Sequence, residues 1–383
     1  MLGKTRRVHF IGVGGIGMSG IAELLANLGY IVTGSDERRS GVTDRLEELG
    51  IRVAIGHAAD QVGGAEVVVV SSAVKPANVE VAEAHRRQVP VIPRAEMLAE
   101  LMRLRYAVAV AGSHGKTTTT SMIALMLERA GLDPTAVIGG RLSAFGSNAR
   151  LGRGEVMVAE ADESDRSFLK LFPTLAVMTN IDHEHLENYG GMADLQNAFV
   201  DFANKVPFYG GVVACADDAN LAAVLPRMTR RVITYGVASP EADVTASDVV
   251  LGPLTVAATV RRRTRTPDRH AADVVLGSLA LGVPGRHNLQ NALAAVAVGL
   301  ELGLGFDRIS SGLADFRGAE RRFEVRGEPR GILVVDDYGH HPTEVSAVID
   351  AARALNRRIV VAFQPHRFSR TAALLDAFGP ALA

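Results

Sequence analysis

Apolar residues in the first hundred positions gather in short runs, and the segments between these runs carry apolar residues at helical spacing. Short apolar runs are typical of strands buried on both faces, and the intervening segments are typical of helices that cover a sheet. The alternation therefore predicts an α/β unit with a doubly wound parallel sheet. Its expected strands lie at residues 8–11, 31–34, 52–55, 66–71 and 90–92.

The same alternation begins again after a helix or connector expected at residues 96–105. Short β-rich pieces at 231–281 predict a side excursion or a small antiparallel sheet, and a helix at 288–302 resumes the α/β pattern. The expected strands of this second unit lie at residues 106–111, 155–159, 175–179 and 211–215.

A third unit is expected to contain strands at 331–337 and 358–363, followed by a helix at 374–383. A sheet of two parallel strands cannot bury both faces and leaves an exposed edge, so this unit should be mobile or rest on the second unit. It is shorter than the ~100 residues that an ordinary α/β domain needs, and we expect it to be incomplete. Whether the chain ends naturally at residue 383 stays open. The predicted domains are residues 1–104, 105–326 and 327–383.

Composition limits the classes of partner. A formal net charge of −1 gives no basic surface for nucleic acid, and no apolar run approaches the ~18 residues of a membrane span. The one basic run, at residues 261–269, has no interleaved aromatic residue and is predicted to be a solvated hairpin loop. Lys4, Arg6 and Arg7 precede an apolar stretch, but its glycines argue against a signal peptide. The single cysteine, Cys215, suits a reducing, cytoplasmic location.

A glycine-rich turn follows the expected strand at 106–111 and precedes a helix that begins with a lysine and four threonines. Backbone N–H groups at a helix N-terminus bind anions, the Lys116 ammonium can reach nucleotide phosphates, and the Thr117 hydroxyl can bind Mg²⁺. The spacing Gly112-x-x-Gly115-Lys116-Thr117 is two residues shorter than the common nucleotide-binding loop. The sequence thus predicts a phosphate-binding loop to which a generic NTPase assignment fits imperfectly.

A second glycine-rich turn, at residues 12–20, follows the first expected strand, and Asp36 ends the next one. Glycines permit a tight turn and the close approach of a pyrophosphate, and an acidic residue at this point meets a ribose hydroxyl. Taken alone, this pattern predicts a dinucleotide site.

Carboxylates follow the expected strand at 155–159, beginning with Glu160, and residues 182–185 add acidic and histidine side chains after the next strand. Open α/β sheets bind ligands at the carboxyl ends of their strands, where carboxylates can hold Mg²⁺ against phosphates. His183 and His185 lack the Cys/His partners of a structural zinc site, so Mg²⁺ with one imidazole is favoured. A solvated acidic loop remains the alternative for either segment.

Two further polar clusters follow the expected strands of the third unit, at residues 337–344 and 363–370. The pair Arg367 and Arg370 suits a carboxylate or a transferring phosphoryl group. A structural role for any one histidine in these clusters remains an alternative.

Taken in order, these motifs resemble the Mur ligase family of peptidoglycan synthesis, and within it the members that join L-alanine to UDP-N-acetylmuramate. The matching motifs span essentially the whole chain and lie at residues 12–20, 112–120, 160–165, 179–182, 283–288, 336–344 and 364–371.

The resemblance implies a three-domain Mur ligase architecture: a Rossmann-like UDP-binding domain, a central P-loop ATPase domain and an incomplete Rossmann-like C-terminal domain that closes over both. It assigns the first glycine-rich turn to the diphosphate of a UDP-sugar. The implied substrates are UDP-N-acetylmuramate and L-alanine, with ATP and Mg²⁺ and with no nucleic acid or membrane partner. The oligomeric state and the selectivity for alanine over glycine or serine stay undetermined. Because the C-terminal domain is expected to be incomplete, this chain is expected to bind both nucleotides but to turn over L-alanine poorly.

Carried over by motif, the resemblance also implies residue roles. The UDP-sugar would contact Gly14, Gly15, Ile16, Gly17, Asp36, Ser71 and Ser72. ATP would contact Gly112, Ser113, His114, Gly115, Lys116, Thr117, Thr118, Asn288, Asn291 and Asp336 or its neighbour Asp337. Thr117, Glu160 and His185 would bind the metal, with His183 the alternative to His185. Lys116, His185 and Arg367 would be catalytic, and Arg367 and Arg370 would bind the amino acid.

The implied reaction needs no side-chain nucleophile. The lactyl carboxylate attacks the γ-phosphate of ATP to give an acyl phosphate, and the amine of L-alanine then displaces phosphate. Other interpretations explain less: an NAD-dependent dehydrogenase leaves Lys116 and Glu160 idle, and a non-catalytic nucleotide sensor or partition-type ATPase leaves the first unit without a role. A murein-peptide-recycling ligase that adds a tripeptide is the nearest alternative within the family.

Overall fold

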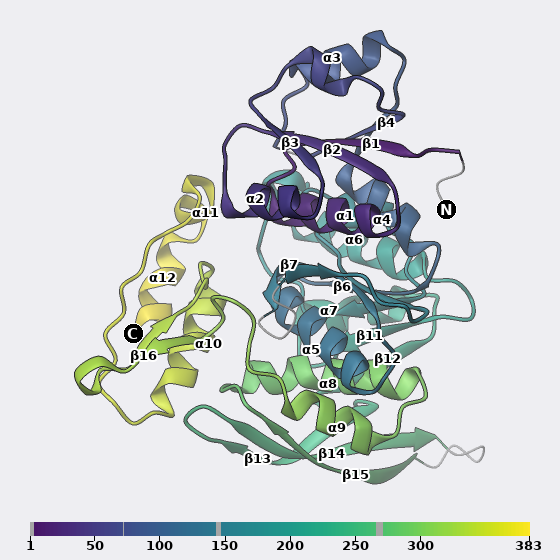
Figure 1. Ribbon diagram of the computed structural model, residues 1–383. Helices are drawn as coiled ribbons and strands as arrows, with labels where there is room; N and C mark the ends of the chain where they lie inside the picture. The colour runs from purple at the N-terminus through teal and green to yellow at the C-terminus, as the bar shows by residue number, and fades with distance from the viewer. Residues whose placement is uncertain (1–3, 72, 143–146, 266–270) are drawn as a thin grey trace.

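The computed structural model describes residues 4–71, 73–142, 147–265 and 271–383. Three sheets mark three units along the chain, and Figure 1 shows the first unit at the top, the second below it and the third at one side. No helix within the described ranges is long and apolar enough to cross a membrane. The solvated loop predicted for the basic run at 261–269 is wrong for residues 261–265, which belong to a strand paired on at least one side. Residues 266–269 lie outside the described residues.

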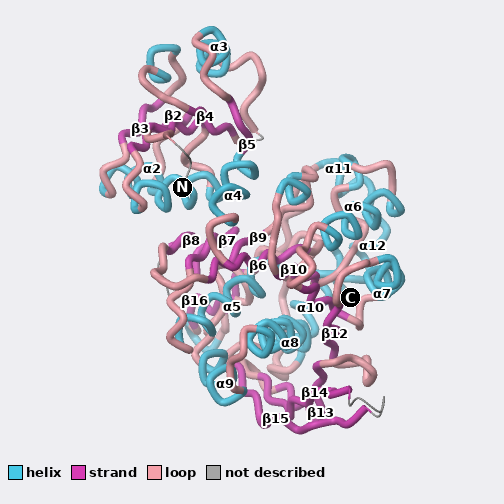
Figure 2. The backbone as a smooth tube through the Cα atoms, turned by 90° about the vertical axis from the view of Figure 1, so that its right-hand side faces the viewer, coloured by secondary structure: helices cyan, strands magenta, loops and turns pink. Residues whose placement is uncertain are grey.

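The first unit is the doubly wound parallel sheet that the sequence predicts. Its strand order is β3-β2-β1-β4-β5, with every pair parallel. Helices α1, α2 and α4 cover one face and α3 lies on the other, as Figures 1 and 2 agree. The bounds are β1 Arg7–Ile11, α1 Ile16–Asn27, β2 Ile31–Asp36, α2 Gly41–Glu48, β3 Arg52–Ile55, η1 Ala59–Val62, β4 Val67–Val70, α3 Val79–Arg86, β5 Val91–Pro93 and α4 Arg94–Met102.

The second unit is built on one sheet of order β15-β14-β13-β12-β11-β10-β6-β9-β7-β8. The β-rich pieces expected at 231–281 continue this sheet: β13 pairs parallel with β12, and the pairs β13–β14 and β14–β15 are antiparallel. Its strands are β6 Tyr106–Ala111, β7 Thr135–Leu142, β8 Ser147–Arg150, β9 Val156–Glu160, β10 Leu175–Met178, β11 Gly211–Cys215, β12 Val232–Gly236, β13 Val244–Leu251, β14 Val256–Arg265 and β15 Ala271–Leu281.

The helices of the second unit complete a continuous core. The α5 residues from Met122 to Leu127 are at most 1% exposed, because this helix packs against the sheet and against α8 and α9. A helix that is apolar on all sides is buried in this way. The bounds are α5 Lys116–Arg129, η2 Ser167–Lys170, η3 Leu186–Asn188, α6 Met192–Asn204, α7 Ala219–Val224, η4 Leu225–Arg227, α8 Arg286–Glu301 and α9 Phe306–Ala314.

The third unit differs from the sequence prediction. Strand β17 (Val334–Asp336) pairs antiparallel with β16 (Glu324–Gly327), and the segment 358–363 forms no strand. An isolated β-branched run has no neighbour to complete its hydrogen bonds, and Val360 is 80% exposed. The predicted sheet of two parallel strands is therefore wrong, while the helical end is confirmed. The remaining bounds are η5 Pro329–Gly331, α10 Pro342–Arg353, α11 Phe368–Ala373 and α12 Leu375–Leu382.

The third unit rests on the second, which is one of the two alternatives that the sequence left open. Thr343 at the start of α10 donates its hydroxyl to Asp182 Oδ2 at 2.7 Å. Arg370 on α11 donates from Nε to Glu184 Oε1 at 2.7 Å, and Nη2 lies 2.6 Å from the same oxygen. Both acidic partners follow β10, so one loop of the second unit holds two helices of the third. The domain boundaries given above remain predictions, and β16 spans the one at 326.

We expect Glu184→Ala to loosen this contact. The side chains of Arg370 and Glu184 are only 6% and 5% exposed, so the variant leaves a buried guanidinium without its carboxylate, at a cost of about 3–5 kcal/mol. Hydrogen exchange followed by mass spectrometry should show faster exchange in α10, α11 and α12, with β1 to β5 unchanged.

The control is Arg353→Ala, which removes two exposed contacts within the third unit, an ion pair with Asp350 and a hydrogen bond to the Ala383 carbonyl, and should cost less than about 1 kcal/mol. Equal protection of α10 to α12 in Glu184→Ala and in the unmodified protein would show that this ion pair does not hold the third unit.

Candidate active site

The phosphate loop connects β6 to α5, as the sequence predicts. Gly112 and Gly115 adopt φ values of +141° and +79°, which side chains rarely tolerate. A Cβ on Gly112 would clash with the Thr179 hydroxyl, and one on Gly115 would lie 2.8 Å from Asn291 Oδ1. Both glycines are therefore required by backbone conformation and by close neighbours.

Hydrogen bonds join the loop that follows β10 to the phosphate loop. The backbone N–H of His114 donates to Asn180 Oδ1 at 2.8 Å, and the Thr179 hydroxyl donates to the His114 carbonyl at 2.6 Å. The N–H of Asp182 donates to Ser113 Oγ at 2.8 Å. The Thr-Asn-Ile-Asp motif thus fixes the shape of the loop that would face the phosphates.

Lys116 is largely buried, although it is the first residue of α5. It is 15% exposed, and its ammonium donates to the Gly112 carbonyl at 2.6 Å and to Glu163 Oε1 at 3.0 Å. Burial by itself lowers the pKa of Lys116, but the carboxylates of Glu163, Asp162 and Glu160 outweigh burial and raise it. The lysine is therefore a charged, preorganised group beside the loop.

A hydroxyl and a carboxylate meet directly beside this lysine. Thr117 Oγ1 donates to Glu160 Oε2 at 2.9 Å, and the N–H of Gly139 donates to the same oxygen at 2.9 Å. His185 lines the same cavity, and burial lowers its pKa, which favours the neutral imidazole that a metal requires. Because oxygen donors of this kind suit Mg²⁺, the residues present fit that ion. His183 is exposed and does not line this cavity.

Two adjoining cavities share the phosphate loop, since His114, Gly115 and Thr117 line both. The first, which we call the apolar cavity, measures about 380 Å³ and carries Val283, Phe316, Phe323, Ala347 and Val348 in its wall. The second, which we call the charged cavity, measures about 440 Å³ and is lined by Lys116, Glu160, His185, Arg367 and other polar side chains.

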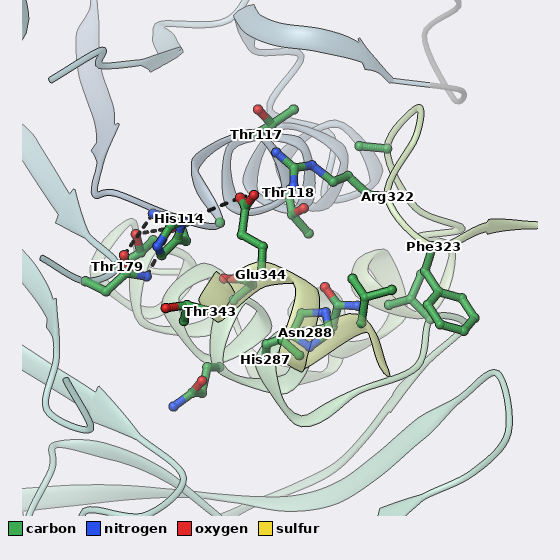
Figure 3. A pocket seen from close by; sticks show the side chains of 18 of the residues that line it. His114, Thr117, Thr118, Thr179, His287, Asn288, Arg322, Phe323, Thr343 and Glu344 are labelled. Atoms are coloured by element: carbon green, nitrogen blue, oxygen red, sulfur yellow. Dashed lines mark hydrogen bonds and ion pairs between the residues drawn. The ribbon is translucent and has the colours of Figure 1, made fainter. Parts of the chain in front are cut away.

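The apolar cavity also contains most of the predicted nucleotide contacts. Thr118, Asn288 and Asn291 line it, and Figure 3 shows Thr118, Asn288 and His287 around the opening. Asp337 lines this cavity, whereas Asp336 lies outside the lining and pairs with Arg326 at 2.9 Å. Of the two aspartates that the motif left open, the geometry therefore favours Asp337.

The two predicted arginines both line the charged cavity but differ in exposure and in their partners. Arg367 is 46% exposed in its side chain and lies 3.3 Å from Glu187 Oε1 and 3.4 Å from His185 Nδ1. Arg370 also lines the cavity, but it is buried and its donors contact Glu184 and the His366 carbonyl. Arg370 therefore anchors α11, and Arg367 is the better placed of the two to meet a substrate carboxylate.

The glycine-rich turn of the first unit connects β1 to the start of α1, where the sequence predicts the UDP-sugar contacts. Gly14 donates its N–H to Asp36 Oδ2 at 2.8 Å, and a Cβ on Gly17 would lie 2.7 Å from Arg94 Nη1. Gly15 caps α1 and Ile16 begins it. Ser71 follows β4 at the same edge, and Ser72 lies outside the described residues.

Two arginines join these sites without a sequence motif to mark them. Arg94 at the start of α4 pairs with Asp162 of the second unit at 3.7 Å, beside the first glycine-rich turn. Arg322 lines both cavities, and its Nη1 lies 3.3 Å from Glu344 Oε1. Figure 3 shows both side chains in the wall of the apolar cavity. In the sequence, Arg322 is marked only by its position in a polar run before Phe323. Arg321 belongs to the same run, so the sequence alone does not show which of the two arginines reaches the cavities.

Models of one protein family match most of the chain. The model described as "Mur ligase family, catalytic domain" matches residues 7–106, "Mur ligase middle domain" matches residues 110–299, and "Mur ligase, glutamate ligase domain" matches residues 321–383.

Individual relatives give the same assignment. The UDP-N-acetylmuramate–L-alanine ligase of Geobacter sp. (strain M21) is 56% identical over 380 residues, which cover 99% of this chain and 80% of the relative. The ligase of the same name from Syntrophotalea carbinolica is 54% identical over 379 residues, covering 99% and 81%.

Solved structures extend the comparison to the fold. The UDP-N-acetylmuramate–alanine ligase of Thermotoga maritima matches with a TM-score of 0.82 at 31% identity, over 98% of this chain and 83% of that one. A murein peptide ligase of Psychrobacter arcticus matches with a TM-score of 0.74 at 26% identity, over 91% and 76%.

Proposed function

Because the chain belongs to the Mur ligase family, we propose that it joins L-alanine to UDP-N-acetylmuramate at the expense of ATP. The observation that carries the proposal is the charged cavity, where a buried lysine, the Thr117–Glu160 pair and Arg367 meet at the phosphate loop. The curated relatives that match 99% of the chain bear the name of this activity. We place the reaction in the cytoplasm, where the buried thiol of Cys215 stays reduced.

ATP would lie across the two cavities. Its adenosine fits the apolar cavity, where His287 stays neutral because burial, together with Arg322, lowers its pKa to about 4. Its phosphates fit the loop, where the N-terminus of α5 and Lys116 supply positive charge.

Acyl transfer then depends on position and charge. The lactyl carboxylate attacks the γ-phosphate to form an acyl phosphate, and Lys116 stabilises the charge on the transferring group. Thr117, Glu160 and His185 would hold Mg²⁺, which neutralises phosphate charge when bound. Arg367 would orient the carboxylate of the incoming amino acid.

The UDP-sugar would bind the first unit. The turn from Gly12 to Gly17 presents the start of α1 to the diphosphate, and Arg94 adds a cation beside it. The ion pair of Arg94 with Asp162 links this site to the acidic loop of the second unit. A sugar bound there is directed toward the charged cavity.

A coupled assay tests the proposal. The protein should release ADP only when ATP, Mg²⁺, UDP-N-acetylmuramate and L-alanine are all present. In a thermal-shift panel, UDP-N-acetylmuramate and ATP-Mg²⁺ should each stabilise the protein, by about 2.7 kcal/mol at 100 times the Kd. NAD(H) should leave the melting temperature unchanged.

The assay also distinguishes the family alternative. Turnover with the tripeptide L-alanyl-γ-D-glutamyl-meso-diaminopimelate but not with L-alanine would overturn the proposal in favour of a peptide ligase. Stabilisation by NAD(H) and not by the UDP-sugar would overturn it in favour of a dehydrogenase.

A further inference from the structure

The histidine His340 occupies a position that the proposed reaction does not yet use. It lies between β17 and α10 and lines the charged cavity together with Lys116, His185 and Arg367. Its side chain is 18% exposed, so the ring is mostly buried and still reaches the cavity. The Tyr338 ring packs edge-on against it, with centroids 4.8 Å apart.

A backbone carbonyl fixes the tautomer of this histidine. Nδ1 of His340 lies 2.8 Å from the Tyr338 carbonyl oxygen, which can only accept a hydrogen bond. Nδ1 therefore carries the proton, and the basic lone pair of the neutral ring is on Nε2. Glu344 Oε2 lies 3.6 Å from Nδ1 and reinforces this orientation. A ring held in this way by a carbonyl and a carboxylate is suited to act as a general base.

The protonation state also fits a base. Burial lowers the pKa of His340, and Arg370 lowers it as well, while Glu344, the Tyr338 carbonyl and Glu184 oppose them. A pKa below the usual 6.5 leaves the neutral ring as the main form at pH 7 and above.

The other histidines of the charged cavity are less suited. Asp182 and Glu344 outweigh burial at His114 and raise its pKa to about 9, so this ring is already protonated at neutral pH. His185 is the proposed metal ligand. No hydrogen bond within the described part of the chain orients the side chain of His366, which also lines the cavity.

We propose that Nε2 of His340 accepts the proton that the substrate amine loses when it attacks the acyl phosphate. This inference rests on the proposed function. The amine enters neutral, after its ammonium has lost one proton to solvent. Its nitrogen forms the new C–N bond, the bond from the acyl carbon to the phosphate oxygen breaks, and orthophosphate leaves. The second proton passes from nitrogen to His340 and from there to phosphate or water, which closes the balance.

The test separates acyl-phosphate formation from amine attack. His340→Asn keeps a side-chain N–H that can donate to the Tyr338 carbonyl but removes the basic nitrogen. Its kcat for L-alanine ligation should fall by about 10²–10⁴-fold. Trapping with hydroxylamine, a nucleophile that is neutral at pH 7 and needs no base, should give hydroxamate at the rate of the unmodified protein. The exposed His85→Asn on α3 serves as the matched control and should leave both rates unchanged.

Two readouts distinguish a base from a structural residue. In the unmodified protein, kcat should decrease at acidic pH as His340 takes up a proton, and His340→Asn should lose this pH dependence. Imidazole added to His340→Ala should restore part of the L-alanine ligation.

The remaining outcomes would each contradict either the role of His340 or the proposed function. Equal kcat in His340→Asn and the unmodified protein, or parallel losses of ligation and hydroxamate, would overturn the role of His340. No UDP-N-acetylmuramate-dependent hydroxamate from the unmodified protein would instead contradict the proposed function itself.

Discussion

Lys116→Ala is expected to lower L-alanine-dependent ADP release by at least about 10²–10³-fold, because one preorganised electrostatic contact contributes about 3–4 kcal/mol to the barrier. The ammonium is already held beside the phosphate loop by the Gly112 and Ser113 carbonyls and by Glu163. It therefore needs little reorganisation to stabilise the transferring phosphoryl group. Acyl-phosphate formation, measured as hydroxamate after trapping with hydroxylamine, should fall by the same factor.

The same substitution should also affect stability, since it leaves Glu163, which is 1% exposed, without its cation. Burial already raises the pKa of Glu163 to about 7, and loss of the lysine raises it further. A carboxyl whose pKa is higher in the folded state binds more protons there, so the variant should lose stability as the pH rises from about 5 to 8.

The double variant Lys116→Ala, Glu163→Gln is the matched control. It removes the unpaired carboxylate, so it should recover much of the stability while remaining inactive. A folded Lys116→Ala protein that releases ADP at a near-normal rate would contradict the role of the lysine.

Glu160→Gln and His185→Asn are each expected to raise the Mg²⁺ concentration needed for half-maximal activity by roughly 10–100-fold or more, since even residues behind metal ligands have effects of that size. Glu160 Oε2 receives hydrogen bonds from the Thr117 hydroxyl and the Gly139 amide, which hold it at the loop. A Mg²⁺ titration of L-alanine-dependent ADP release measures the effect.

The chain offers two matched controls for this titration. Asp165→Asn changes an exposed carboxylate of the same acidic run, and His183→Asn changes the exposed histidine of the same loop. Both should give the titration of the unmodified protein. If His183→Asn shifts the curve and His185→Asn does not, the assignment of the histidine ligand is wrong.

The sequence alone was sufficient to predict the parallel sheet of the first unit and most of the strands and helices of the second unit. Its apolar runs and glycine turns are local signals, because strand burial and positive φ values constrain single residues and their neighbours. The spacing of Gly112 and Gly115, for example, predicts the phosphate loop from the sequence alone, and the structure places both glycines at positive φ. The motif order was likewise enough to identify the family.

The sequence was misleading where a strand depends on a partner. The run at 358–363 has the residues of a strand but no neighbouring strand, and β17 pairs with β16, which precedes the expected start of the third unit. Pairing is a long-range property that a local run of apolar residues does not encode.

The convergence of side chains was decided only by the tertiary structure. It packed Lys116 against Glu163, brought Asp337 rather than Asp336 to the apolar cavity, and placed His185 rather than His183 in the charged cavity that Glu160 also lines. It also brought Arg94 and Arg322 to the sites, although neither belongs to a recognisable motif. The sequence by itself determined the family and the phosphate loop, since these depend on local patterns. The proposed metal ligand, the proposed base and the buried ion pairs depend on which distant residues of the chain meet, and this is fixed by packing and register.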